Sequence, residues 1–163
     1  MTRSLRNLAT LILCACFALT LAACDSDSSD NDGNGGPSTG NAGVTATVNG
    51  ASWSATTLSA AGRDEDDTSF GFGGISATGS SISVSVMSLS AGTYSTNNLE
   101  FVAVYSATTT ATPFTTALGG SGTITVTSIT AERVRGTFSF TASNGSGGTV
   151  TVTNGEFDVA FLD

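Results

Sequence analysis

The sequence predicts an all-β protein with a single domain of about eight to ten short antiparallel strands. Apolar and polar residues alternate over several short segments, as in strands with one buried and one exposed face. Turn signals separate these segments at regular spacing, and the chain holds 20 glycines but only two prolines. No segment shows the 3.6-residue apolar period of an amphipathic helix. A β-sandwich is the expected architecture, and a closed lipocalin-like β-barrel is the alternative.

The first two expected strands form a hairpin over residues 44–48 and 51–55. The dipeptide between them, Asn49-Gly50, favours a two-residue turn because both residues tolerate positive φ. Residues 44–163 are the expected domain, and this hairpin opens it.

Three further strands are expected over residues 68–77, 81–89 and 98–106. Three glycines in the first of them predict a bent or bulged strand. The third is more fully apolar, which predicts a central position in a sheet. Pro113 predicts a loop over 108–118, because proline cannot donate a ladder hydrogen bond.

The last third of the chain predicts a four-stranded meander. Its expected strands are 122–129, 133–142, 149–153 and 156–162, with Asn154-Gly155 as a second tight hairpin turn. Seven phenylalanines are expected in the core, enough to fill a small domain and favour a solid interior over a ligand cavity. They are Phe70, Phe72, Phe101, Phe138, Phe140, Phe157 and Phe161.

The N-terminal segment predicts lipid attachment. Arg3 and Arg6 precede a mostly apolar run over residues 8–21. As a helix this run would span about 21 Å, too little for a hydrocarbon core of about 30 Å. Leu21-Ala-Ala-Cys24 resembles a bacterial lipobox, which implies removal of residues 1–23 and acylation of Cys24. An ordinary secretory signal cut at Ala23 and an uncleaved anchor are the alternatives.

Residues 24–43 are expected to be the lipidated cysteine and a flexible linker. Asp25–Gly36 holds only Asp, Ser, Asn and Gly, so it has no apolar surface to bury. The expected location is the bacterial cell envelope, with the covalent lipid on Cys24 holding the protein to the inner or outer membrane. The domain would face the periplasm or the exterior.

The charge of the mature chain excludes polyanionic partners. Cleavage before Cys24 would leave three basic and 13 acidic residues, a side-chain charge of −10. Such a surface repels phosphate backbones, so we expect no nucleic-acid partner.

The composition also excludes most catalytic arrangements, and we expect no enzyme. The chain has no histidine or lysine, and the mature domain would have no free thiol. Serine–histidine, cysteine–histidine and serine–lysine nucleophiles therefore cannot be assembled, and zinc loses its usual ligands. A carboxylate pair, as used in glycoside hydrolysis, is the surviving alternative. The acids that could supply it are Glu100, Glu132, Glu156 and Asp158.

Asp64, Glu65, Asp66 and Asp67 form a dense acidic loop between two expected strands. Hard cations prefer clustered carboxylate oxygens, so these four residues predict a weak calcium site. A solvated loop that keeps the protein soluble is the alternative. No other cofactor is expected.

Alternate threonines mark the exposed faces of two expected strands, at Thr123, Thr125 and Thr127 and at Thr149, Thr151 and Thr153. They could form flat ladders that bind ice or another ordered polymer. A wet strand face is the favoured interpretation, because threonine is a good strand former.

Two other sets of side chains have a binding and a packing interpretation. Trp53, Tyr94 and Tyr105 could stack on sugar rings, but packing in the core or at its rim is favoured. Arg133 and Arg135 share a strand face, and nearby acids such as Glu132 are their expected partners.

Four segments together resemble an uncharacterised family of β-rich bacterial envelope lipoproteins that carry one such domain after a lipobox. The segments are Ala46-Thr-Val-Asn-Gly-Ala-Ser-Trp-Ser-Ala55, Gly92-Thr-Tyr94, Val134-Arg-Gly-Thr-Phe-Ser-Phe-Thr-Ala142 and Val152-Thr-Asn-Gly-Glu-Phe157. Most of these residues are turn and core residues. The resemblance therefore implies a fold and assigns no catalytic or binding residue.

The function expected from the sequence is that of a non-catalytic interaction or structural module, anchored by lipid, whose exposed sheet face or loops contact a glycan or a protein. A lipocalin-like carrier of a small apolar ligand is the alternative. A carboxylate-based glycan-active enzyme is the third hypothesis.

Overall fold

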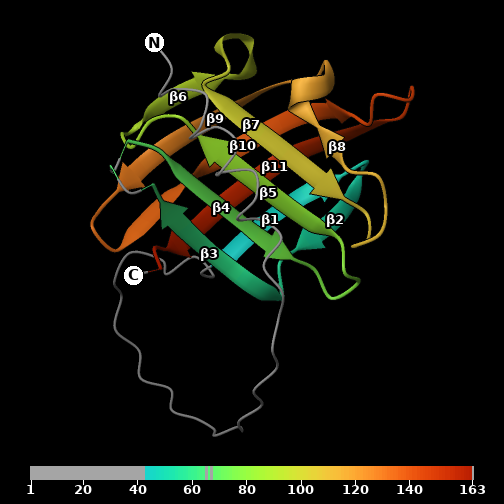
Figure 1. Ribbon diagram of the computed structural model, residues 1–163. Helices are drawn as coiled ribbons and strands as arrows, with labels where there is room; N and C mark the ends of the chain where they lie inside the picture. Colours follow the sequence, from blue (N-terminus) through green and yellow to red (C-terminus); the bar gives the residue numbers. More distant parts are fainter. Residues whose placement is uncertain (1–42, 65, 67, 163) are drawn as a thin grey trace, which may run out of the picture. The chain divides into compact units, whose positions relative to one another are not determined.

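The computed structural model describes residues 43–64, 66 and 68–162, and these residues form an all-β domain (Figure 1). They belong to one compact unit of the chain, Thr39–Asp163. The expected signal peptide, Cys24 and the linker up to residue 42 lie outside the described residues. Within the described ranges, no helix has the length and apolarity needed to cross a membrane.

The described residues of the domain form eleven strands and two single-turn 3-10 helices. The strands are β1 (Gly43–Val48), β2 (Ala51–Ser54), β3 (Thr57–Arg63), β4 (Phe70–Ile75), β5 (Ser81–Val86), β6 (Gly92–Ser95), β7 (Phe101–Ser106), β8 (Phe114–Thr115), β9 (Ser121–Ile129), β10 (Arg133–Ser143) and β11 (Thr149–Ala160). The 3-10 helices are η2 (Thr96–Asn98) and η3 (Thr116–Leu118). All pairings between named strands are antiparallel, so the predicted fold class is confirmed.

The strands form two facing layers of one curled sheet (Figure 1). Layer A has the order β2-β1-β11-β10-β9-β6, and layer B has the order β3-β4-β5-β7-β8. The layers join at two corners, where Ser143 of β10 pairs with Thr115 of β8 and Ala61 of β3 bridges to Phe161. The fold therefore combines the packed layers of a sandwich with the curl of a barrel.

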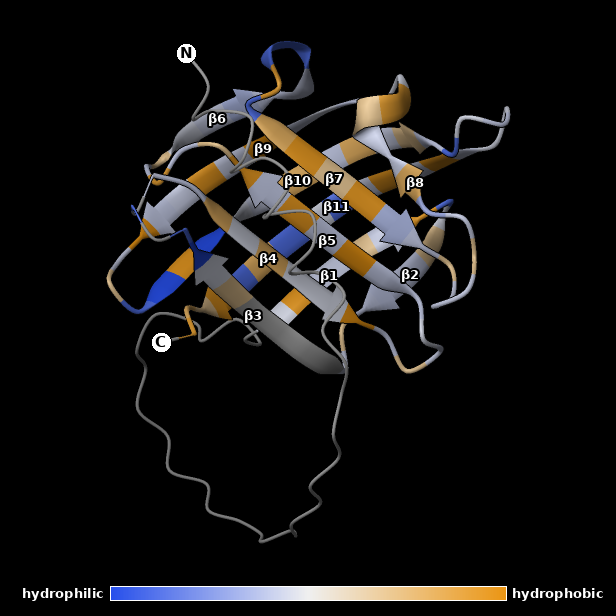
Figure 2. Ribbon diagram, in the orientation of Figure 1, coloured by the Kyte–Doolittle hydropathy of each residue, from blue (hydrophilic) through white to orange (hydrophobic). Residues whose placement is uncertain are grey.

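The core lies between the layers and is filled by aromatic rings. Phe72 of β4 stacks on Phe157 of β11 with ring centroids 4.2 Å apart, and Phe138 of β10 lies 5.9 Å from Phe72. Six of the seven phenylalanines predicted for the core are buried. The seventh, Phe161, is half-buried against the core, and the guanidinium carbon of Arg63 lies 3.9 Å from its ring centroid. Figure 2 shows the underlying alternation of apolar and polar residues along the strands.

The two Asn-Gly pairs have different structures. Asn49 and Gly50 have φ values of 48° and 84° in the β1–β2 turn, so the predicted hairpin is confirmed. Asn154-Gly155 is not a turn, because β11 runs through it without interruption. Asn154 still has a positive φ of 50°, as in a turn. Because β1 and β10 pair with β11 on both sides, this conformation produces a bulge in the strand and not a hairpin turn. The last third is therefore a three-stranded meander.

The glycine-rich strand over Phe70–Ile75 does not contain the bulge that was one of its two expected irregularities. β4 pairs with β5 without a register shift, and the irregularity lies between Thr57 and Ala60 of β3. Gly73 instead lets β4 and β5 approach closely, because a Cβ there would lie 2.9 Å from the carbonyl oxygen of Ile82. The expected loop over 108–118 contains the short strand β8 and the helix η3 after Pro113.

Candidate functional site

The outer face of layer A carries a row of polar side chains that crosses six strands. We call this set the cross-strand row: Thr93 of β6, Thr125 of β9, Thr137 of β10, Glu156 of β11, Thr45 of β1 and Ser54 of β2. Each residue is directly opposite the next in the register of the sheet. Adjacent strands are about 4.8 Å apart, so the row presents a polar group at each such step.

Strand alternation explains why these side chains face outward. The neighbours of the row along the chain, among them Ile124, Phe138 and Phe157, are buried in the core. Successive side chains of a strand point to opposite faces, so burial of these residues directs the row toward solvent. All members of the row are exposed except Thr125, which is half-buried.

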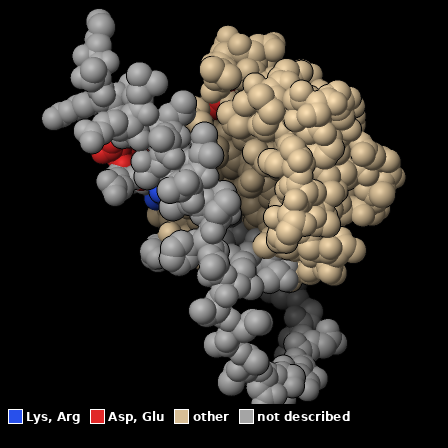
Figure 3. Space-filling view, turned by 45° about the vertical axis from the view of Figure 1, so that its right-hand side comes forward, with Lys and Arg blue, Asp and Glu red and all other residues tan. Residues whose placement is uncertain are grey.

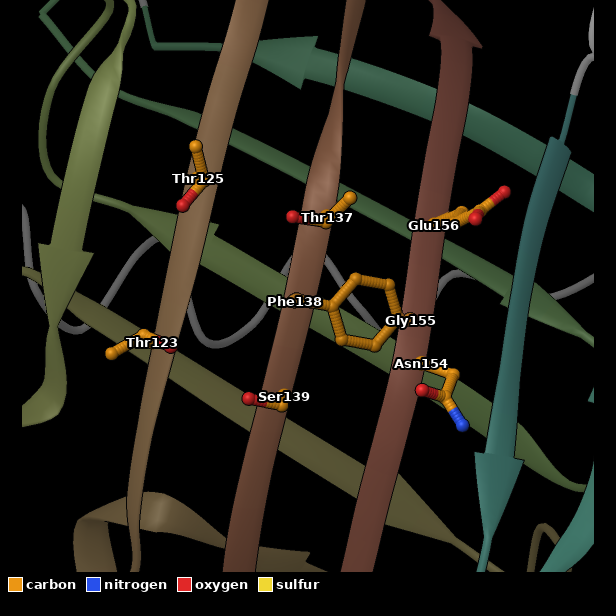
Figure 4. Close-up of a pocket in the computed structure, with 8 residues that line it drawn as sticks. All are labelled: Thr123, Thr125, Thr137, Phe138, Ser139, Asn154, Gly155 and Glu156. Carbon is orange, nitrogen blue, oxygen red and sulfur yellow. The ribbon is translucent and has the colours of Figure 1, made fainter.

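A shallow depression of about 310 Å³ lies on the same face (Figure 4). Figure 4 shows Thr125, Thr137 and Glu156 side by side on three adjacent strands, with Thr123, Ser139 and Asn154 in a second line beside them. The bulge at Asn154 supplies an additional outward side chain to this rim. The ring of Phe138 lies beneath this rim. A Cβ added at Gly155 would lie 2.6 Å from that ring.

The polar groups of this face are sparsely bonded to one another. The hydroxyl oxygens of Thr93 and Thr125 are 3.0 Å apart, and the amide of Asn154 lies 3.5 Å from the Thr47 hydroxyl. The Glu156 carboxylate has no hydrogen bond or ion pair with any residue that the structure describes. Its two carboxylate oxygens are therefore available to hydrogen-bond donors from outside the domain.

The basic residues beside the row are neutralised by a carboxylate. Arg133 contacts Asp158 at 2.7 Å, and Nε of Arg135 lies 3.0 Å from the other oxygen of the same carboxylate. The expectation of Glu132 as their partner is wrong, because β11 places Asp158 directly opposite Arg135 while Glu132 lies in the β9–β10 turn. Figure 3 shows that the described surface in that view is almost wholly uncharged.

Two of the four acids proposed for a carboxylate pair share the outer face. Glu156 and Asp158 are two residues apart on β11, which corresponds to about 7 Å along a strand. That separation falls in the range of inverting glycosidases, but Asp158 is held by two arginines on an open surface. Glu100 instead accepts the Ser95 N–H at 2.7 Å, beside η2.

The Asp64 carboxylate accepts three hydrogen bonds from the loop that follows it. It accepts the N–H groups of Thr68 and Ser69 at 2.6 and 2.9 Å, and the Thr68 hydroxyl as well. Burial raises the pKa of Asp64, but these hydrogen bonds lower it more, so the net pKa lies below the ordinary value of 3.8.

The predicted calcium site is only partly within the described residues, because Glu65 and Asp67 lie outside them. Among the residues that the structure describes, no three acidic, histidine or cysteine side chains gather in a metal-binding group. Asp66 is the remaining described acid of this loop. The calcium site stays a prediction.

The three aromatic residues that could stack on sugars are used in packing. Trp53 is 8% exposed, and its indole N–H donates to the Ser80 hydroxyl at 2.9 Å. The Tyr94 hydroxyl donates to the Ser90 carbonyl at 2.7 Å, and the Tyr105 ring packs 6.3 Å from Phe114. The favoured packing interpretation is confirmed.

The two threonine ladders occupy the outer face as expected, but they do not form the longest aligned set. Thr125 belongs to the cross-strand row, whereas Thr151 of β11 is opposite Thr141 of β10. Thr93 and Thr137 were not among the residues predicted from the sequence. Both lie next to an apolar residue in a segment where apolar and polar residues alternate. This alternation predicts that they face outward, but it does not predict which residues lie opposite them on the neighbouring strands.

Comparison with known proteins places the domain in a family. A domain of unknown function, DUF6252, matches residues 40–159. The chain belongs to this family. The match reaches from before β1 almost to the end of β11, and it confirms the predicted relationship to an uncharacterised family. No curated protein and no solved structure matches the chain. DUF6252 membership therefore identifies the domain without assigning a site.

Proposed function

We propose that this protein is a lipid-anchored, non-catalytic binding module of the bacterial cell envelope, and that it contacts a glycan through the outer face of layer A. The observation that supports this function is the cross-strand row, in which hydroxyls and the Glu156 carboxylate, which bonds to no described residue, are aligned beside a depression. Hydroxyl groups donate and accept hydrogen bonds, as the groups of a sugar do.

The anchor is proposed from the sequence. Leu21-Ala-Ala-Cys24 follows a short apolar segment, and the acidic linker after it would hold the domain away from the bilayer. Attachment through Cys24 would hold the domain at the inner or outer membrane, among the polymers of the envelope.

Two other functions have less support. A carrier of an apolar ligand needs an interior space, but the rings of Phe72, Phe138 and Phe157 pack against one another between the layers. A carboxylate enzyme needs an acid and a base in a shielded cleft, and Glu156 and Asp158 lie on an open sheet face.

Co-sedimentation with envelope polysaccharide tests the proposed function. The full-length protein, purified in a detergent without sugar groups, is mixed with protease-treated insoluble envelope glycan from its host. We expect the protein to sediment with the glycan and to release no new reducing ends. Protein that stays in the supernatant would contradict binding, and released sugar ends would contradict the non-catalytic assignment.

A further inference from the structure

We infer that the ligand is a neutral, extended glycan chain that lies across the strands along the cross-strand row, with Glu156 accepting hydrogen bonds from its hydroxyls. This inference rests on the proposed function and adds the charge class of the glycan, its direction on the sheet and the residue that anchors it.

The direction follows from the register. Across the strands, the row offers a polar group at each step of about 4.8 Å. Along a strand, outward side chains recur only about every 7 Å, because alternate residues enter the core. An extended β-linked hexose chain advances by nearly the strand spacing with each sugar. A chain across the sheet therefore keeps each sugar opposite one side chain of the row, from Thr93 to Ser54.

The neutral charge follows from the ionised groups of this face. Arg133 and Arg135 are both paired with Asp158, so they are poorly placed to receive an anionic sugar. Glu156 is exposed and would repel sulfate, phosphate or uronate groups. A neutral sugar instead offers adjacent hydroxyls, which can donate to the two oxygens of one carboxylate.

The depression beside Glu156 is where we expect the centre of the glycan chain to bind. It is a shallow, open hollow of about 310 Å³, so it would contact one side of a chain and not enclose it. Thr137 and Thr125 continue the rim from Glu156 across β10 and β9. The strongest contacts are therefore expected at the centre of the row, with weaker single hydrogen bonds toward its ends.

A length series of cello-oligosaccharides tests the direction. These neutral β-linked glucose chains, from two to eight sugars, are titrated calorimetrically into the full-length protein in a detergent without sugar groups. We expect affinity to rise with length up to about six sugars, one for each strand crossed, and then to level off. Affinity that is independent of length, or no heat of binding for the hexamer at millimolar concentration, would overturn the inference.

Three variants test the residues. Glu156→Gln keeps the size of the side chain and removes the charge, and we expect about a tenfold loss of affinity for the hexamer. Thr137→Val keeps the β-branched shape and removes the hydroxyl, with an expected loss of about threefold to tenfold. Thr151→Val is the matched control, because Thr151 is exposed on the same face outside the row. Equal effects of Thr137→Val and Thr151→Val would overturn the assignment.

Other ligands would give different results. Tighter binding of dextran sulfate than of the cello-hexamer would overturn the neutral charge class. Thermal hysteresis of freezing that is lost in Thr137→Val would identify an ice-binding face instead. If the protein sediments with envelope glycan but the row variants bind as the wild type does, this inference fails while the proposed function stands.

Discussion

At Asp64, three hydrogen bonds converge on a single carboxylate and close the loop between β3 and β4. Because they favour the ionised form, they lower the pKa of Asp64, and the stability they contribute depends on pH. This contribution is complete above the unfolded-state pKa of about 4, and it is lost as pH falls through the lower folded-state pKa.

We therefore expect Asp64→Ala to lower the free energy of unfolding by about 1 kcal/mol at pH 7, where solvent partly screens these bonds. The difference between variant and wild type should shrink below about pH 4, where Asp64 becomes protonated in the unfolded state and then in the folded state. Urea denaturation at pH 7 and pH 3 measures both values. A difference that is the same at the two pH values would show that the charge of Asp64 is irrelevant to the loop.

The same carboxylate bears on the predicted calcium site. Its oxygens accept three hydrogen bonds within the protein and keep a lone pair for a cation, so a calcium site here predicts a higher melting temperature in millimolar Ca²⁺ than in EDTA. An unchanged melting temperature would contradict the site. Differential scanning calorimetry makes this comparison. A cation that binds only the folded state must raise the melting temperature, so a rise in Ca²⁺ would support a site at Asp64–Asp67.

At the scale of elements, glycines set how closely β9, β10 and β11 pack. A Cβ at Gly136 of β10 would lie 2.0 Å from the Thr125 carbonyl oxygen and 2.6 Å from the Phe157 ring. The backbone and the ring would both have to move to make room. Gly136 is thus a packing requirement of layer A beneath the cross-strand row.

We expect Gly136→Ala to destabilise the domain by about 2–3 kcal/mol, because it overpacks a close strand contact. Gly62→Ala is the matched control, since a Cβ at Gly62 on β3 would meet no atom of the described residues within 4 Å. The control should change stability by less than about 0.5 kcal/mol. Comparable losses in the two variants, measured by urea denaturation, would contradict this steric account.

The strand elements also show what local sequence predicts. The Asn49-Gly50 hairpin is predictable because its turn and both strands are adjacent in sequence. Asn154-Gly155 has the same local preference, but pairing of β11 with β1, about 100 residues away, makes it a bulge. Strands β3, β6 and β8 were missed because they are short or small-residue segments whose conformation depends on partners elsewhere in the sheet.

The site was predictable in its residue types and not in its geometry. Alternating threonines on β9 and β11 indicated an outward polar face, and Glu156 was among the acids considered. Their alignment with Thr93 and Ser54 depends on the register of five strand pairs and on the bulge near Asn154. A shift of one residue in any pair would turn that strand's side chains to the other face, and local patterns do not fix such a register.

At the scale of the whole molecule, the proposed location depends on Cys24. We expect Cys24→Ser to prevent acylation, so that the variant is recovered as soluble or unprocessed protein and takes up no labelled palmitate. Membrane fractionation and metabolic labelling measure these two outcomes. A variant that is still processed, membrane-bound and lipid-labelled would contradict the anchor, and binding by the domain would be unaffected either way.

The central claim is that ligand binding occurs on the outer face of layer A. Chemical-shift mapping tests it most directly, with isotope-labelled protein titrated with solubilised envelope glycan from the host. We expect shifts centred on Thr125, Thr137 and Glu156 that fade toward the edge strands β6 and β2. Shifts concentrated on the core rings around Phe72, or on the outer face of layer B, would contradict it.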